Sequence, residues 1–136
     1  PLHTCANYNG QLTGNDGVHF RWESRMVDEL ILEIDPVGKI YKIDNYIETA
    51  LNITRDSFSV YPRLLDADSI ARRHLTHEQA KQLQSYNVLA FEDRYLKILY
   101  AETEDVVHDR LGRATVLVAS YWYSCWLAAG APEPPK

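Results

Sequence analysis

The chain has 136 residues, of which 46% are hydrophobic and 24% charged, and its formal net charge is -5 at pH 7. This length supports one hydrophobic core, so we expect a single domain over residues 1–136. The acidic balance argues against a protein that mainly makes broad contact with DNA or RNA, because such proteins are normally basic. It does not exclude an enzyme that cuts nucleic acid at a local metal cluster.

Apolar residues recur at helical spacing along most of the chain and predict an all-α, multi-helix bundle. Residues 4–17 are rich in Asn and Gly, which indicates a loop. A first helix is predicted over 18–34 and should end at Asp35-Pro36. The apolar face of this helix is expected to comprise Met26, Val27, Leu30 and Ile34. Its solvent-exposed face is expected to comprise Arg21, Arg25, Asp28 and Glu29.

The middle of the chain predicts shorter elements. A second helix is expected over 37–53, with Ile40, Ile43, Ile47, Ala50 and Leu51 on its buried face. A break follows at Tyr61-Pro62, and Asp66 or Asp68 is expected to cap a short turn of helix that reaches Arg72. The residues 76–79 have the form of a capping box, which predicts a short helix to about residue 86.

The C-terminal region, 88–129, is helical by pattern and forms either two helices or one with a bend near Tyr100. Gly130 should end it. Its predicted core stripe comprises Val107, Leu111, Ala114, Val118, Trp122 and Cys125. The stretch 114–131 carries no charged residue and approaches the length of a membrane span, but its polar residues and spacing favour a buried core helix.

The two cysteines, Cys5 and Cys125, lie near opposite ends of the chain. Sequence allows one disulfide between them and cannot establish it. Two free thiols are the favoured interpretation.

His19 and Glu23 lie four residues apart on the first predicted helix, so their side chains leave the same face. Extending the core stripe backwards from Met26 reaches both positions. An ionised carboxylate there is costly unless it is paired or bound to a cation. Alone, this spacing also suits an ordinary His–Glu pair on a helix surface.

His3 extends the pair to a set of two histidines and one carboxylate. This is the arrangement of catalytic zinc sites, which leave one coordination position for water or substrate. The Asn- and Gly-rich loop gives the chain freedom to return His3 to the helix. We therefore expect His3, His19 and Glu23 to bind one zinc ion.

Two stretches resemble a known zinc-ligand pattern. Pro1-Leu2-His3, the loop, and Gly17-Val18-His19-Phe20-Arg21-Trp22-Glu23 resemble the pattern of the phospholipase C and P-one/S-one nuclease superfamily. Its members typically read H-x-x-x-D-x-x-Q-P-L-H, then a variable loop, then H-x-x-x-D or H-x-x-x-E. In the family the three matching ligands share one zinc. Leu111-Gly112-Arg113-Ala114 is also similar to a motif in the family's last helix.

The resemblance implies a zinc-dependent hydrolase of phosphodiester bonds, in nucleic acid or in a phospholipid head group. The full-length family binds three zinc ions, and its other ligands lie before the position of Pro1. We therefore expect this chain to be the C-terminal half, to bind one zinc weakly and to be inactive without the missing N-terminal half. H-x-x-x-D-x-x-Q is expected just upstream. The family's export implies a periplasmic or secreted protein.

Other polar and aromatic residues have weaker claims to a site. Asn7 is a candidate substrate-binding residue, although a turn role suits it better. Tyr8 and Trp22 could stack on a base or pack on a lipid, but packing within the core or a loop is favoured. Solvated roles are favoured for the remaining histidines, His74, His77 and His108.

Two other classes of function remain open from the sequence. The chain could be a non-catalytic helical interaction module, in which the His19–Glu23 pair only decorates a surface. It could also be a small membrane protein anchored by its last helix, an alternative that the polar residues in that helix disfavour. Nuclease and phospholipase C are not separable from these residues.

Overall fold

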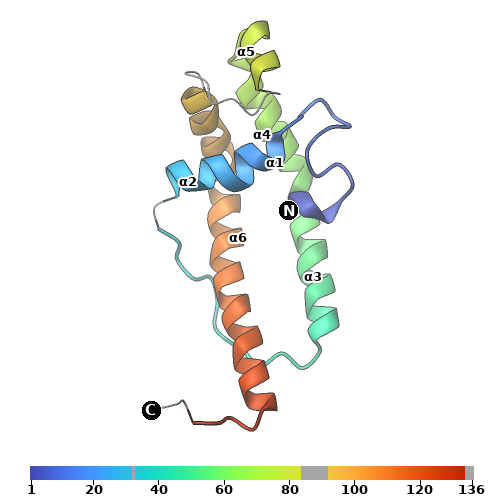
Figure 1. Cartoon of the computed structure of the whole chain (residues 1–136), viewed down its shortest axis with the longest axis vertical. Helices are drawn as coiled ribbons and strands as arrows, with labels where there is room; N and C mark the ends of the chain where they lie inside the picture. The colour runs from blue at the N-terminus through green and yellow to red at the C-terminus, as the bar shows by residue number, and fades with distance from the viewer. Residues whose placement is uncertain (32, 84–91, 134–136) are drawn as a thin grey trace.

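The computed structural model describes residues 1–31, 33–83 and 92–133. These residues form helices joined by loops, and no strand occurs among them, so the predicted all-α class is confirmed. The longest helix, α6 (Glu92–Ala128), runs along most of the length of the molecule (Figure 1). At 1.5 Å per residue it extends over about 55 Å.

The hydrophobic core lies where α4 (Tyr61–Arg73) packs along the first half of α6. The first helical segment, residues 18–30, crosses α6 near this end, as Figure 1 shows. The indole Nε1 of Trp22 in this segment donates a hydrogen bond of 3.2 Å to Thr103 Oγ1 on α6. The central core side chains are Leu2, Val18, Trp22, Met26, Leu64, Ala67, Ala71, Tyr95, Leu96, Leu99, Val106 and Val107.

The first helical segment is shorter than predicted. It consists of α1 (Val18–Phe20), a π-helical turn (Arg21–Met26) and α2 (Val27–Leu30). The backbone turns extended at Ile31, so the helix ends before Asp35-Pro36. Ile34, predicted to lie in the apolar stripe, is 42% exposed.

The predicted second helix over 37–53 is confirmed for residues 46–53 and wrong for residues 37–45. Residues 37–45 run beside α6 without helical structure, and α3 begins only at Tyr46 and continues to Ser59. Asn45 caps α3, since its side-chain oxygen accepts a hydrogen bond from the Glu48 backbone N–H at 3.1 Å. Of the apolar face predicted for that helix, Ile43 is buried, whereas Ile40, Ile47 and Leu51 are exposed.

Backbone hydrogen bonds to α6 explain why residues 37–45 are not helical. The N–H of Tyr41 donates to Ser120 Oγ at 3.2 Å, and the N–H of Ile43 donates to Ser124 Oγ at 2.7 Å. Val37 N–H donates to the Gly112 carbonyl at 3.1 Å. A β-carbon at Gly112 would lie 2.7 Å from the Val37 side chain, so glycine permits this close approach. We refer to residues 37–45 as the strap.

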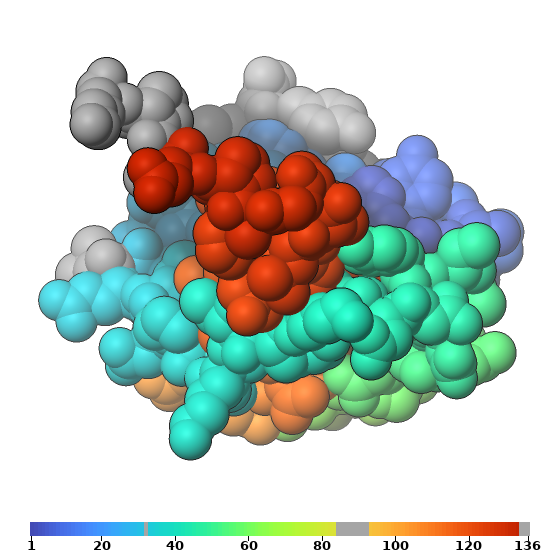
Figure 2. Space-filling view, turned by 90° about the horizontal axis from the view of Figure 1, so that it is seen from below, coloured from blue at the N-terminus to red at the C-terminus, as the bar shows by residue number. Residues whose placement is uncertain are grey.

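Figure 2 shows the strap and α3 side by side at the lower end of the molecule, next to the last turns of α6. The predicted stripe of α6 is wrong in this half, because the strap binds a different face. Val118, Trp122 and Cys125 are exposed, while Val116, Ser120 and Ser124 are buried. The two serines satisfy backbone donors of the strap, which an apolar side chain could not do.

The predicted break at Tyr61-Pro62 is present, because α3 ends at Ser59 and α4 begins at Tyr61. Pro62 lies in the first turn of α4, where its missing N–H is not needed. Asp68 lies in the middle of α4 and is fully buried, so it caps nothing. Asp66 is exposed on the same helix.

The predicted capping box is present at the start of α5 (His77–Gln82). Gln79 N–H donates to Thr76 Oγ1 at 3.3 Å, and Thr76 N–H donates back to Gln79 Oε1 at 2.9 Å. The predicted end of this helix near 86, and residues 88–91 of the next, lie outside the described residues. From Glu92 on, α6 continues without interruption past Tyr100. In the described part of the chain, no helix is both long and apolar enough to cross a membrane.

A buried polar network connects α4 to the first helical segment, the preceding loop and α6. At its centre is Asp68, whose carboxylate accepts hydrogen bonds from Arg72 Nε (2.6 Å), Arg21 Nη2 (3.1 Å) and Asn15 Nδ2 (2.7 Å). The hydroxyl of Tyr95 on α6 donates to the same carboxylate. Arg21, predicted to face water, is therefore buried with its charge paired.

The network makes the stability of the fold sensitive to alkaline pH. Burial raises the pKa of the Tyr95 hydroxyl, and the neighbouring Asp68 carboxylate raises it further. Its contribution to stability is therefore complete below about pH 10, where an unfolded tyrosine titrates, and is lost as the pH rises further. We expect the free energy of unfolding to fall above that pH, and to fall less steeply in Tyr95→Phe. Urea denaturation at a series of pH values measures both slopes, and equal slopes would contradict the role of Tyr95.

Candidate metal centre

The N-terminal residues place His3 beside the first helical segment. Leu2 is fully buried in the core, and the short helical turn Leu2–Thr4 carries His3 on its exposed side. The Thr4 side chain closes this turn by donating to the Pro1 carbonyl at 2.5 Å. Burial of Leu2 therefore fixes the direction in which His3 points.

The loop after this turn returns the chain to the start of α1. It turns at Gly10, whose carbonyl accepts the N–H groups of Thr13 and Asn15, at 3.1 and 3.0 Å. Gly10 has a φ of +73°, and a β-carbon there would lie 2.4 Å from the Asn15 side chain. Only glycine suits this turn, which brings the residue before α1 back towards the N-terminal turn.

The Asn7 side chain stabilises this loop through hydrogen bonds to other loop residues. Its side-chain oxygen accepts the Leu12 N–H at 2.7 Å, and its amide nitrogen donates to Thr13 Oγ1 at 3.1 Å. The Tyr61 hydroxyl donates to the Asn7 carbonyl at 2.9 Å. The turn role described for this residue thus accounts for both ends of its side chain.

His19 and Glu23 project from the outer edge of the first helical segment. They flank the buried ridge of Val18, Trp22 and Met26 instead of continuing it, so the carboxylate is at the rim of the core. Arg21, two residues from each ligand, projects inward to Asp68. The inward arginine anchors the segment, and the two candidate ligands are left at the surface.

The structure brings His3, His19 and Glu23 together. The Nε2 atoms of His3 and His19 lie 3.2 and 3.3 Å from the same oxygen, Glu23 Oε2. The two Nε2 atoms are 2.8 Å apart. Their side chains are 65%, 32% and 25% exposed, so the group is open to solvent on the His3 side.

This triangle of ligand atoms fits a tetrahedral metal ion. Zinc bonds of 2.0–2.1 Å at tetrahedral angles separate two ligand atoms by about 3.3 Å. Separations of 2.8 to 3.3 Å therefore need only small adjustments to receive an ion. Two imidazoles and a carboxylate are also a donor set typical of zinc, and three protein ligands leave a position for water or substrate.

Tyr8 borders the cluster. Its ring stacks on His3 with centroids 5.8 Å apart and meets His19 edge-on at 5.5 Å. The ring is 44% exposed. The sequence offered Tyr8 only as a loop or stacking residue. Its contact with both histidines depends on the loop path, which spacing does not reveal.

The other candidate residues do not join this group. Trp22 is buried in the core, and His74 and His77 are exposed. His108 Nε2 lies 3.0 Å from the Tyr100 hydroxyl on α6. Among the described residues, His3, His19 and Glu23 form the group of three or more potential ligands whose atoms converge. Both cysteines are free thiols.

Comparisons of the chain with protein-family models, with curated proteins and with solved structures found no match.

Proposed function

We propose that this chain supplies a zinc site to a zinc-dependent hydrolase of phosphodiester bonds, with His3, His19 and Glu23 as the ligands. The observation that carries the proposal is the convergence of two imidazole nitrogens on one carboxylate oxygen, at 3.2 and 3.3 Å. The spacing of these residues, which resembles the phospholipase C and P-one/S-one nuclease pattern, supports the choice of reaction.

In such a hydrolase the three side chains would hold the ion and take no proton themselves. When bound, zinc lowers the pKa of a coordinated water and neutralises charge on phosphoryl oxygens. Tyr8 closes one side of the cluster by packing on both histidines, and the exposed side of His3 leaves access for a substrate. The family's trinuclear centre would need ligands beyond these three, so we expect one zinc per chain and negligible hydrolysis by the chain alone.

A zinc titration tests the proposal. Isothermal titration of the purified chain is expected to show one zinc per chain, and the double variant His19→Ala/Glu23→Ala is expected to lose this binding. The matched control is His74→Ala/His77→Ala, which removes two exposed histidines outside the cluster. The control should bind zinc as the wild type does.

One outcome would overturn the ligand assignment, and another would contradict the expected inactivity of the chain alone. If the double variant binds zinc as tightly as the wild type, the ligand assignment is wrong, and the chain is better described as a helical interaction module. If the wild type with zinc hydrolyses bis(p-nitrophenyl) phosphate at an enzymatic rate, the centre is complete and the need for further ligands is wrong.

A further inference from the structure

The two histidines of the candidate metal centre are not oriented by the hydrogen bond that usually orients a metal ligand. A metal-bound histidine normally donates its second ring N–H to a carbonyl, a carboxylate or a water molecule, and this bond fixes the plane of the ring. In the described part of the chain, the hydrogen bonds and ion pairs of His3 and His19 all involve Nε2, and none involves Nδ1. The torsion that rotates a histidine ring has only broad minima. Another protein contact therefore has to hold these two rings in place.

The ring of Tyr8 makes such a contact with both histidines. It lies nearly parallel to the His3 ring, with an interplanar angle of 10° and centroids 5.8 Å apart. It meets the His19 ring at 81°, with centroids 5.5 Å apart. Offset stacking and edge-on packing are the two arrangements that aromatic rings prefer. Both contacts are made while the two Nε2 atoms approach Glu23, so they favour the ring planes that a shared ion needs.

His3 depends on this contact more than His19 does. His19 projects from a helix and its side chain is 32% exposed, whereas the His3 side chain is 65% exposed and belongs to a three-residue turn near the start of the chain. Burial of Leu2 sets the direction of His3 but not the rotation of its ring. The Tyr8 ring restricts that rotation because it lies almost parallel to the imidazole.

The loop holds Tyr8 from both sides. The carbonyl of Asn7, the residue before it, accepts a hydrogen bond of 2.9 Å from the Tyr61 hydroxyl on α4. The N–H of Asn9, the residue after it, donates to Gln11 Oε1 at 3.1 Å. The backbone of Tyr8 is therefore fixed although its ring is 44% exposed.

We propose that Tyr8 is a positioning residue of the zinc site, whose ring replaces the absent Nδ1 hydrogen bonds and holds both imidazoles with Nε2 towards Glu23. The inference rests on the proposed function, because it takes His3, His19 and Glu23 as the zinc ligands. Tyr8 acts through the histidines and is not itself a ligand. Ligands that are already oriented lose less conformational entropy when they bind, so the packed ring raises the affinity for zinc.

Isothermal titration with zinc of three single variants tests the role of the ring. Tyr8→Ala should weaken zinc binding about tenfold, the lower end of the range of roughly 10–100-fold for losing a residue that orients a metal ligand. Tyr8→Phe keeps the ring and should bind as the wild type does. Leu12→Ala is the matched control, because it shortens a side chain of the same loop that is 75% exposed. It should also bind as the wild type does.

NMR of the metal-free protein in EDTA reports the ring orientation directly. The rings of His3 and His19 have centroids 4.5 Å apart, so nuclear Overhauser contacts between their protons are expected in the wild type. These contacts should persist in Tyr8→Phe and weaken in Tyr8→Ala, while the circular dichroism spectrum and the urea midpoint stay unchanged. A residue that only stabilises the fold would not change the histidine contacts selectively.

The outcomes separate this inference from the proposed function. Zinc binding by Tyr8→Ala at wild-type affinity, or unchanged histidine contacts in that variant, would refute the role of Tyr8 and leave the ligand assignment intact. Equal weakening in Tyr8→Phe and Tyr8→Ala would refute it too, because the hydroxyl group and not the ring would then matter. If the wild type binds no zinc, the proposed function and the role of Tyr8 are both wrong.

Discussion

Replacing Asp68 by alanine is expected to lower the free energy of unfolding by about 3–5 kcal/mol, because it leaves buried charges without a partner. Arg21, whose side chain is 4% exposed, would lose its ion pair with Asp68. Arg72 would lose its bond of 2.6 Å to the same carboxylate. Since domains are typically stable by only about 5–15 kcal/mol, the loss would be a large part of the total.

Urea denaturation followed by circular dichroism measures this effect. Asp66→Ala is the matched control, because Asp66 is exposed two residues earlier on the same helix. It should change the free energy of unfolding by no more than about 0.5 kcal/mol. Asp68→Asn keeps the shape of the side chain but removes the charge, so it should fall between the two. Asp68→Ala with wild-type stability would show that the network does not hold the fold.

Zinc is expected to raise the free energy of unfolding of the wild type by about 2.7 kcal/mol when free zinc is one hundred times its dissociation constant. The ligands meet only in the folded chain, since His3 is 16 residues from His19. An ion bound to all three therefore stabilises the folded state over the unfolded one. Thermal or urea denaturation at increasing zinc concentration measures the effect.

Glu23→Gln is the sharpest variant for this experiment. It preserves the volume of the side chain and replaces the carboxylate with a carboxamide, a much weaker zinc ligand, so zinc should stabilise the variant much less than the wild type. Because Glu23 is at the rim of the core, the metal-free variant should be about as stable as the wild type. An equal response to zinc in both proteins would mean that binding occurs elsewhere.

The sequence predicted those elements whose signals are local. The capping box of α5 and the helical nature of α6 follow from neighbouring residues, and both are present. The strap was predicted as helix because its apolar residues have helical spacing. Its real partner is a pair of serine hydroxyls about 80 residues away, which no local pattern indicates.

The polar core was the main omission. Asp68 has the sequence features of a capping residue, and Arg21 lies among charged residues. Their pairing joins positions 47 residues apart and becomes visible only when the π-helical turn Arg21–Met26 is placed against α4. The meeting of His19 and Glu23 could be predicted from a spacing of four on a helix. The contact of His3 with His19 and Glu23 depends on the path of the loop between them. The glycine content of the loop allows this path but does not determine it.

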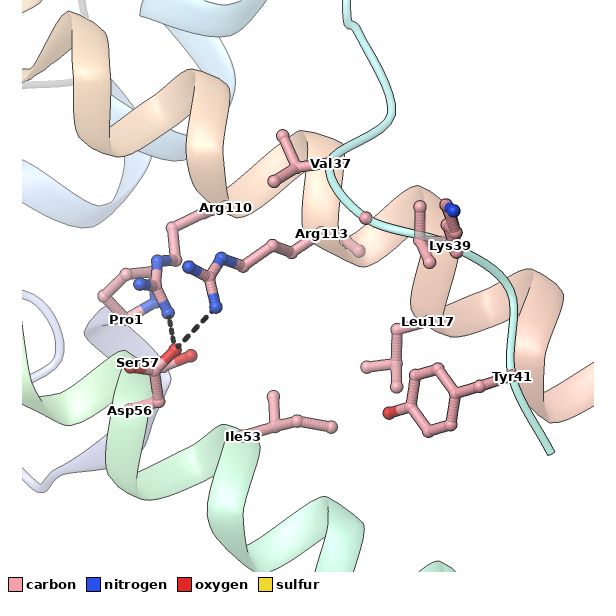
Figure 3. Close-up of a pocket in the computed structure, with 13 residues that line it drawn as sticks. Pro1, Val37, Lys39, Tyr41, Ile53, Asp56, Ser57, Arg110, Arg113 and Leu117 are labelled. Carbon is pink, nitrogen blue, oxygen red and sulfur yellow. Dashed lines mark hydrogen bonds and ion pairs between the residues drawn. The ribbon is translucent and has the colours of Figure 1, made fainter. Parts of the chain in front are cut away.

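The strap is attached to α6 through its own peptide groups at Val37, Tyr41 and Ile43, not through matched side chains. Mutations at positions 39–41 should therefore be tolerated as long as Gly112, Ser120 and Ser124 remain, whereas Gly38, with a φ of +108°, does not accept a side chain without strain. Lys39 and Tyr41 of this segment line a cavity of about 480 Å³ between the strap, α3 and α6 (Figure 3). Evolution could in this way alter the shape and charge of the cavity wall while the helical scaffold stays the same.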